Sequence, residues 1–168
     1  MNGRIVNGQP TIPAQHVVRS EPRRRYQRTI TLDEYWMGRD VAYAHELTDA
    51  TVRNAAVTVE RVNRLLYVMA QHGVHAECRP DSGSPVASGW RPVAINARVP
   101  AAVPDSPHII GAACDLYDPL NALDGWCVAH AHVLADLELW LEHPEYTEGW
   151  CHVQIVALRC GSRMFRPW

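Results

Sequence analysis

The sequence predicts an α+β domain in which helices pack on a small antiparallel sheet. Three observations lead to this prediction: a long amphipathic pattern between Thr48 and Gly73, a second helical stretch at 120–136, and two strand-like runs at 137–142 and 150–158. The chain has 168 residues, of which 47% are hydrophobic, so it can bury a substantial core. This length fits one domain with a tail better than it fits two domains.

The first helix is predicted from apolar spacing, with Thr48 as its N-cap and Gly73 as its stop. The apolar positions of this helix are Val52, Ala55, Ala56, Val59, Val62, Leu65, Leu66 and Met69. Residues 79–107 carry eight prolines or glycines among short apolar pairs, which favours loops and short strands. The runs 137–142 and 150–158 are joined by a polar segment, so they are predicted to form a hairpin with a longer loop.

Residues 1–28 are predicted to form an extended or disordered basic arm, and residues 29–168 the folded domain. The arm lacks periodicity and holds six of the sixteen basic residues of the chain. The other charges are spread evenly and the formal net charge is -2, so no nucleic-acid partner is expected. The sequence lacks a signal-peptide pattern and any apolar run of about 18 residues, so we expect synthesis in a cytoplasm without a signal peptide and no membrane span.

Two histidines and one aspartate form the most informative pattern. His108 and Asp115 stand seven residues apart with small residues between them, and His152 lies in the strand-like run 150–154. Two imidazole nitrogens and one carboxylate oxygen, with one open position, are a ligand set of catalytic zinc, which lowers the pKa of bound water to roughly 7. The alternative is coincidence, because a chain with nine histidines will contain some His-to-Asp pair.

The segment 106–115, Ser-x-His-x-x-Gly-x-Ala-x-Asp, and the downstream Trp-x-His-Val at 150–153 resemble the signature of a known enzyme family. This is the zinc D-alanyl-D-alanine carboxypeptidase and L-alanyl-D-glutamate endopeptidase family, whose fold is shared with the hedgehog signalling domain. The resemblance implies that His108, Asp115 and His152 bind zinc. Ser-Gly-Trp-Arg-Pro at 88–92 resembles the family's Ser-Gly-aromatic-Arg segment and implies that Arg91 binds a carboxylate or carbonyl of the substrate. The alternative for Arg91 is a surface salt bridge.

Further segments, at 30–35, 46–48, 61–66 and 139–144, resemble phage-encoded members, so the resemblance covers about residues 30–168. It implies a zinc metallopeptidase that cleaves the peptidoglycan stem peptide at D-Ala-D-Ala or at L-Ala-D-Glu. Such a lysin would be made in the host cytoplasm and act on the cell wall, either free or in the virion, where the arm would contact other virion proteins. The alternative is a virion structural or binding module that keeps the zinc-site fold without hydrolysis.

The general base departs from the family pattern. Many relatives place an acid three residues before the last histidine, whereas this chain has Gly149 there. A base must come within hydrogen-bond reach of the attacking water, so the candidates are the acids of the predicted hairpin, Glu142 and Glu148. Glu142 is favoured because it ends a strand that could face His152, while Glu148 lies in a loop open to solvent.

The five cysteines are odd in number and include no Cys-x-x-Cys pair, so free thiols are expected. A third hypothesis is a cysteine hydrolase that pairs Cys114 or Cys151 with His108 or His152. It is disfavoured because each thiol adjoins a proposed metal ligand in sequence, and neighbours on a strand point to opposite faces.

Overall fold

The computed structural model describes residues 28–100, 102–158 and 161–167, and it confirms the predicted α+β class. Residues 1–27 of the predicted arm lie outside the described residues. Arg28, the last residue of that arm, donates hydrogen bonds from Nη2 to Glu34 and to the carbonyl of Gly83, each at 2.8 Å.

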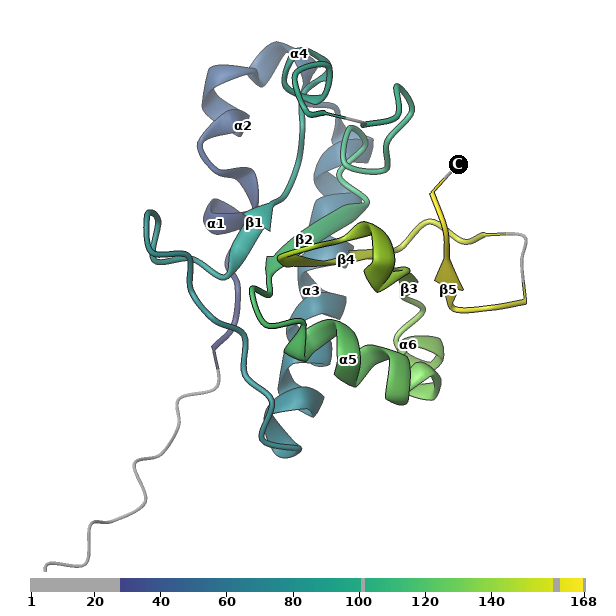
Figure 1. Cartoon of the computed structure of the whole chain (residues 1–168). Helices are drawn as coiled ribbons and strands as arrows, with labels where there is room; N and C mark the ends of the chain where they lie inside the picture. Colours follow the sequence, from purple (N-terminus) through teal and green to yellow (C-terminus); the bar gives the residue numbers. More distant parts are fainter. Residues whose placement is uncertain (1–27, 101, 159–160, 168) are drawn as a thin grey trace, which may run out of the picture.

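The described residues form a five-stranded sheet in the order β1-β2-β4-β3-β5, accompanied by helices (Figure 1). Neighbouring strands are antiparallel, except that β5 runs parallel to β3, which the sequence did not predict. No described helix combines the length and apolar character needed to cross a bilayer. The elements in chain order are α1 Leu32–Trp36, α2 Arg39–Ala42, η1 Ala44–Glu46, α3 Asp49–Gln71, β1 Val86–Ser88, α4 Val93–Asn96, β2 Ala113–Tyr117, α5 Ala122–Ala129, α6 Ala131–Asp136, β3 Trp140–Glu142, η2 Pro144–Tyr146, β4 Trp150–Gln154 and β5 Met164–Phe165.

Helix α3 begins where the sequence predicts. The Thr48 hydroxyl accepts a hydrogen bond from the backbone N–H of Thr51 at 3.1 Å, which satisfies one of the free donors of the first turn. The buried face differs in detail from the predicted one, because Val52 and Ala56 are exposed. Thr51 and Thr58 are buried instead, since they face the loop that precedes β2.

The second predicted helix is two helices, α5 and α6, because the chain leaves helical geometry at His130 (φ −123°, ψ 43°). The ring Nδ1 of His130 shares the Trp126 carbonyl with the backbone N–H of the same residue, at 2.8 Å and 3.0 Å. A side chain that competes for a helix carbonyl weakens the regular hydrogen-bond ladder at that position.

The predicted hairpin is confirmed, although its strands are shorter than the apolar runs. Strand β3 pairs antiparallel with β4, with Trp140 opposite Gln154 and Leu141 opposite Val153. Leu137 still has helical geometry as the C-cap of α6, and Glu138 takes a left-handed conformation (φ 50°), so the strand begins later than the apolar run.

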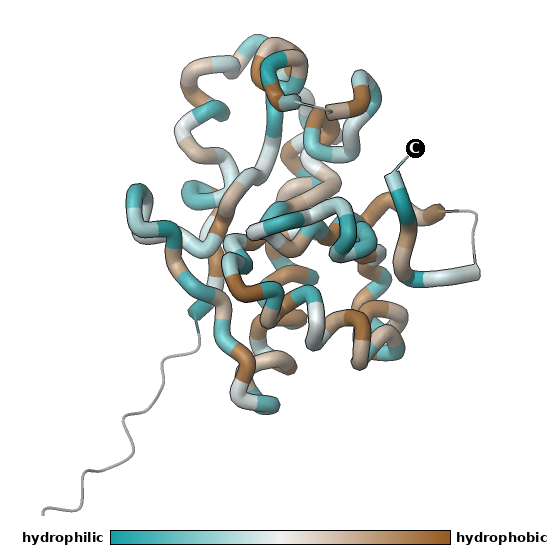
Figure 2. The backbone as a smooth tube through the Cα atoms, in the orientation of Figure 1, coloured by the Kyte–Doolittle hydropathy of each residue, from teal (hydrophilic) through white to brown (hydrophobic). Residues whose placement is uncertain are grey.

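The core lies between α3 and one face of the sheet, and α3 passes behind β2 and β4 in Figure 1. Alternate residues of the two central strands, Cys114 and Leu116 on β2 and Cys151 and Val153 on β4, are fully buried in this core. Figure 2 shows hydrophobic and hydrophilic residues interspersed along the backbone of these elements. By the alternation of strands, the residues between the core positions face the other side of the sheet.

Candidate metal centre

Strand pairing brings two of the three predicted ligands together. Asp115 on β2 lies directly opposite His152 on β4 in the antiparallel register. Both side chains point away from the core, because their strand neighbours fill it. The aspartate and histidine, 37 residues apart in sequence, therefore share one face of the sheet.

The third predicted ligand, His108, lies on the loop before β2, and α3 holds this loop in place. Thr58 donates from its hydroxyl to the carbonyl of Gly111 at 3.0 Å, and Asn54 donates from its amide to the carbonyl of Ile110 at 2.9 Å. Gly111 has φ +74°, and a Cβ there would lie 2.6 Å from the Thr51 carbonyl oxygen. Glycine is thus needed both for the turn and for the close approach to α3.

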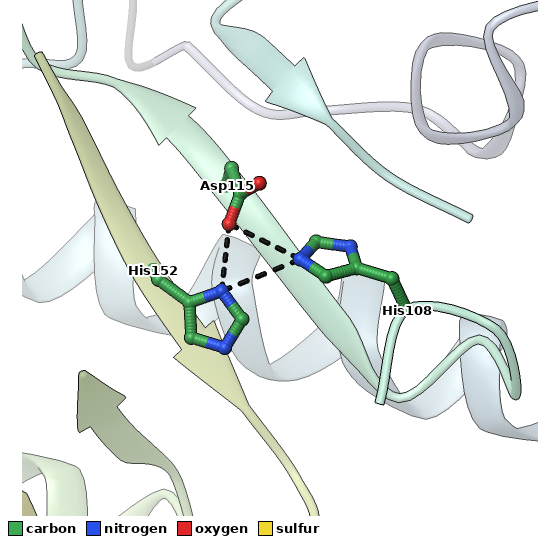
Figure 3. A group of neighbouring side chains, drawn as sticks. All are labelled: His108, Asp115 and His152. Atoms are coloured by element: carbon green, nitrogen blue, oxygen red, sulfur yellow. Dashed lines mark hydrogen bonds and ion pairs between the residues drawn. The ribbon is translucent and has the colours of Figure 1, made fainter. Parts of the chain in front are cut away.

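The three ligand atoms converge on one point (Figure 3). The Asp115 Oδ1 atom lies 2.7 Å from Nδ1 of His152 and 3.2 Å from Nε2 of His108, and the two ring nitrogens are 3.3 Å apart. The three residues are nearly inaccessible, with His108 1% exposed and the other two 6% exposed. Electron-rich atoms this close, shielded from water, repel one another unless a proton or a cation lies between them.

Hydrogen bonds on the far side of each ring assign the ligand nitrogens. Nδ1 of His108 lies 2.7 Å from the carbonyl of Gly89, so it carries the proton and leaves the lone pair on Nε2. Nε2 of His152 lies 3.4 Å from Oε1 of Gln154, whose amide group in turn donates to the Val156 carbonyl at 3.0 Å. Such outer hydrogen bonds orient metal-binding histidines in known metal sites.

Gly89 admits no side chain at this position. A Cβ there would lie 1.9 Å from the Tyr35 carbonyl oxygen, although its φ needs no glycine. The carbonyl that orients His108 is therefore held against α1 by direct backbone packing.

The second oxygen of Asp115 is held by Arg91. Nη2 of Arg91 donates to Oδ2 of Asp115 at 2.9 Å, and Nε of the same guanidinium donates to the Ser88 hydroxyl at 3.1 Å. Arg91 is only 8% exposed, so it forms a buried ion pair rather than a surface salt bridge. The ion pair leaves Oδ1 of Asp115 facing the two imidazoles.

The protonation equilibria fit this arrangement. Burial acts to raise the pKa of Asp115, but the charges and hydrogen bonds of His108 and His152 outweigh it and hold the pKa well below its usual range. Burial lowers the pKa of His108, which keeps Nε2 available as an electron donor. Burial also acts on His152, but there the hydrogen bond and charge of Asp115 prevail and raise the pKa.

Of the two candidate bases, the structure brings only Glu142 close to the group of His108, Asp115 and His152. Its Oε2 atom lies 3.9 Å from Nδ1 of His152. Burial, aided by the charge of Asp115, raises the pKa of Glu142 against the opposing effects of His152 and Arg91. Glu148 is exposed in the turn before β4, and no hydrogen bond or ion pair described for the cluster involves it.

Gly149 has φ +88°, a conformation that side chains other than glycine rarely adopt. The turn before β4 therefore favours glycine at this position.

The thiols of Cys114 and Cys151 lie on the core face, fully buried, whereas Asp115 and His152 face the other side. Burial, aided by the charge of Asp115, raises the pKa of Cys114 well above its usual value, so this thiol is a poor nucleophile. The geometry gives the cysteine-hydrolase hypothesis no support.

Sequence reasoning missed Gln154 and Phe165 as neighbours of the centre. Gln154 follows His152 by two residues, so the period of a strand could have placed both on one face. Phe165 stands edge-on to the His152 ring with centroids 6.0 Å apart. No local signal pointed to it, because β5 reaches β3 from a distant part of the chain.

The buried group His108, Asp115 and His152 could hold a metal ion, with ligand atoms from two imidazoles and one carboxylate. A comparison of the chain with protein-family models, with curated proteins and with solved structures finds no match to any of them.

Proposed function

We propose that the protein is a zinc-dependent hydrolase of an amide bond in the peptidoglycan stem peptide. The observation that supports this most directly is the convergence of His108, Asp115 and His152 within hydrogen-bond distance of one another in a buried site. The donor set fits zinc, which binds two imidazole nitrogens and a carboxylate oxygen in known catalytic sites. When bound, zinc would supply a Lewis acid that polarises the scissile carbonyl and makes water a better nucleophile at neutral pH.

Glu142 is the residue that we assign as general base. Its carboxylate lies next to the ligand nitrogen of His152, close enough to accept a proton from the attacking water and pass it to the leaving amine. Its raised pKa favours this exchange, since a base works best when its pKa approaches the working pH.

Arg91 has two roles in this proposal. Its Nη2 and Nε atoms fix Asp115 and Ser88, and its remaining nitrogen, Nη1, is the group that we assign to a substrate carboxylate or carbonyl. The ion pair with Asp115 means that Arg91 also positions a ligand. A substitution at Arg91 should therefore weaken metal binding as well as substrate binding.

The substrate class and the biological setting come from the sequence resemblance. The motifs around Arg91, His108 and His152 resemble those of D-alanyl-D-alanine carboxypeptidases and L-alanyl-D-glutamate endopeptidases, including phage-encoded lysins. We therefore propose a stem peptide with D-amino acids as substrate, and a lysin made in a bacterial host as the biological context.

The proposal is tested by clearing of permeabilised Gram-negative cells and by release of peptides from purified peptidoglycan. We expect activity that a chelator abolishes and zinc restores. His108→Ala should abolish activity and zinc binding at the buried site, whereas His45→Ala, an exposed histidine elsewhere, should change neither. Glu142→Gln should retain zinc and lose about 10²- to 10⁴-fold in rate. Equal clearing with the chelator present would refute zinc-dependent hydrolysis.

A second candidate function is a virion structural or binding module that retains the metal centre. The observation that favours it is Gly149, whose left-handed conformation disfavours the acid found there in related enzymes. One bound zinc per chain without release of peptides from any peptidoglycan tested would support this second function over hydrolysis.

A further inference from the structure

We propose that the protein carries a second metal site, separate from the buried centre, for a late first-row divalent cation such as Ni²⁺, Cu²⁺ or Zn²⁺. Its ligands are three histidines, His72, His130 and His132, which we call the histidine cluster. This proposal does not depend on the proposed hydrolase function.

The break between α5 and α6 creates the cluster. Residues two apart on a continuous helix point to different faces, so His130 and His132 would diverge if the predicted single helix existed. His130 instead lies at the junction of the two helices, and its ring centroid is 6.0 Å from that of His132. His72, the C-cap residue of α3, brings a third ring to within 5.4 Å of His130.

The distance between the two imidazole rings of the buried centre serves as a reference for the ring distances in the histidine cluster. The rings of His108 and His152 have centroids 5.1 Å apart, and their ligand nitrogens are 3.3 Å apart. The separation of His72 from His130 is only 0.3 Å larger than that of the buried pair (5.4 against 5.1 Å). Among the described residues only the buried group has three ligand atoms that all lie within 4.8 Å of one another, so the rings of the histidine cluster lie near each other but must rotate to bind one ion.

His130 is already oriented as a ligand. Its Nδ1 donates to the carbonyl of Trp126 at 2.8 Å, so the lone pair is on Nε2. Its ring also stacks on Trp126, with centroids 4.1 Å apart and planes inclined by 12°. A carbonyl that fixes the tautomer of an imidazole is the usual support of a metal-binding histidine.

The other two rings make no described side-chain hydrogen bond, although the His72 ring also contacts Trp126, with centroids 5.6 Å apart. His72 and His132 are exposed, so rotation about their side-chain bonds can bring their nitrogens to the ion at the cost of rotamer entropy. This cost makes the cluster a weaker binder than the buried centre. A site of imidazoles without a carboxylate selects nickel, copper or zinc over magnesium and calcium, which prefer oxygen ligands.

Isothermal titration of the full chain with Ni²⁺, after one equivalent of zinc has been added, tests the proposal. The wild-type protein should show a Ni²⁺-binding event. Loss of a contact that only supports a metal ligand weakens metal binding by roughly tenfold. We therefore expect Ni²⁺ affinity to fall by at least this factor in each of three variants, His72→Ala, His130→Ala and His132→Ala. Mg²⁺ should give no corresponding heat.

Two matched controls locate the event. His45→Ala removes an exposed histidine outside the cluster and should leave Ni²⁺ affinity unchanged. His108→Ala disables the buried centre, so it is titrated without added zinc, and it should also retain Ni²⁺ binding at the cluster. The proposal is overturned if wild type shows no Ni²⁺ binding, if any cluster variant keeps wild-type affinity, or if His108→Ala abolishes the event.

Discussion

The buried centre and the histidine cluster space their imidazoles almost equally but differ in support. In the buried centre every ring has a hydrogen-bond partner on its far side, and Arg91 holds the ligand Asp115. In the histidine cluster the described hydrogen bonds fix only the ring of His130, which also stacks on Trp126, while the His72 ring has a looser contact with the same indole. The comparison teaches that a fold can bring imidazole rings close together with few supporting contacts. Orienting each donor atom toward one ion requires a second layer of hydrogen bonds around the rings.

The largest difference between the two regions should appear on removal of Asp115. Asp115→Ala leaves Arg91 buried without its partner, so we expect loss of the metal and a decrease of about 3–5 kcal/mol in unfolding free energy. Metal analysis and urea unfolding measure the two effects. His132→Ala, in the exposed cluster, should change stability by less than about 0.5 kcal/mol. An Asp115→Ala protein that keeps wild-type stability and wild-type zinc affinity would contradict the assignment of the buried centre.

Gly111→Ala tests whether close packing of the loop on α3 places His108. The positive φ costs roughly 1–2 kcal/mol, and the contact with the Thr51 carbonyl adds about 1–3 kcal/mol. Gly83→Ala is the matched control, because Gly83 has φ +66° in open space and meets only the first cost. The midpoint temperature of thermal unfolding and the zinc affinity should both fall further for Gly111→Ala than for Gly83→Ala. Equal losses in the two variants would show that α3 does not set the position of the loop.

Gln154→Leu removes an outer contact of the buried centre and keeps its three ligands. We expect a folded protein whose zinc affinity is about 10- to 100-fold weaker, because the His152 ring loses the acceptor that fixes its tautomer. Competition with a chelator of known affinity measures the change, and Ni²⁺ binding at the histidine cluster should stay unaltered. An unchanged zinc affinity would mean that strand pairing alone orients His152.

The smallest effect on metal affinity is expected from a change in helix α3, which contacts both regions. Helix α3 holds the His108 loop through Asn54 and Thr58, and it ends at His72 of the cluster. Thr48→Ala removes its N-cap and should cost about 1 kcal/mol of stability. Both metal affinities should be preserved once the protein is folded, and a selective loss at one site would show that α3 moves.

The sequence allowed the α+β class, helix α3 with its cap, the hairpin and the group His108, Asp115 and His152 to be predicted. The fold class, the helix and the hairpin depend on local periodicity, cap chemistry and short-range strand pairing, which a sequence displays directly. The group of three residues was predicted instead from its donor types and from the resemblance of the motifs around it. The break at His130 could not be predicted, because a side chain competing for a helix carbonyl leaves no mark in the apolar pattern. The pairing of β5 with β3 was also missed, because it joins two short segments that show no strand-like alternation in the sequence.

The crowding at Gly89 limits how this protein can vary. A saturation library at this codon should return only glycine among metal-binding clones, because even one methyl group would collide with the Tyr35 backbone. Changing α1 side chains would not relieve the conflict, since the obstacle is main chain. Any redesign of the centre would therefore have to treat the crossing of α1 and residue 89 as fixed and vary the sheet side, around Gln154, instead.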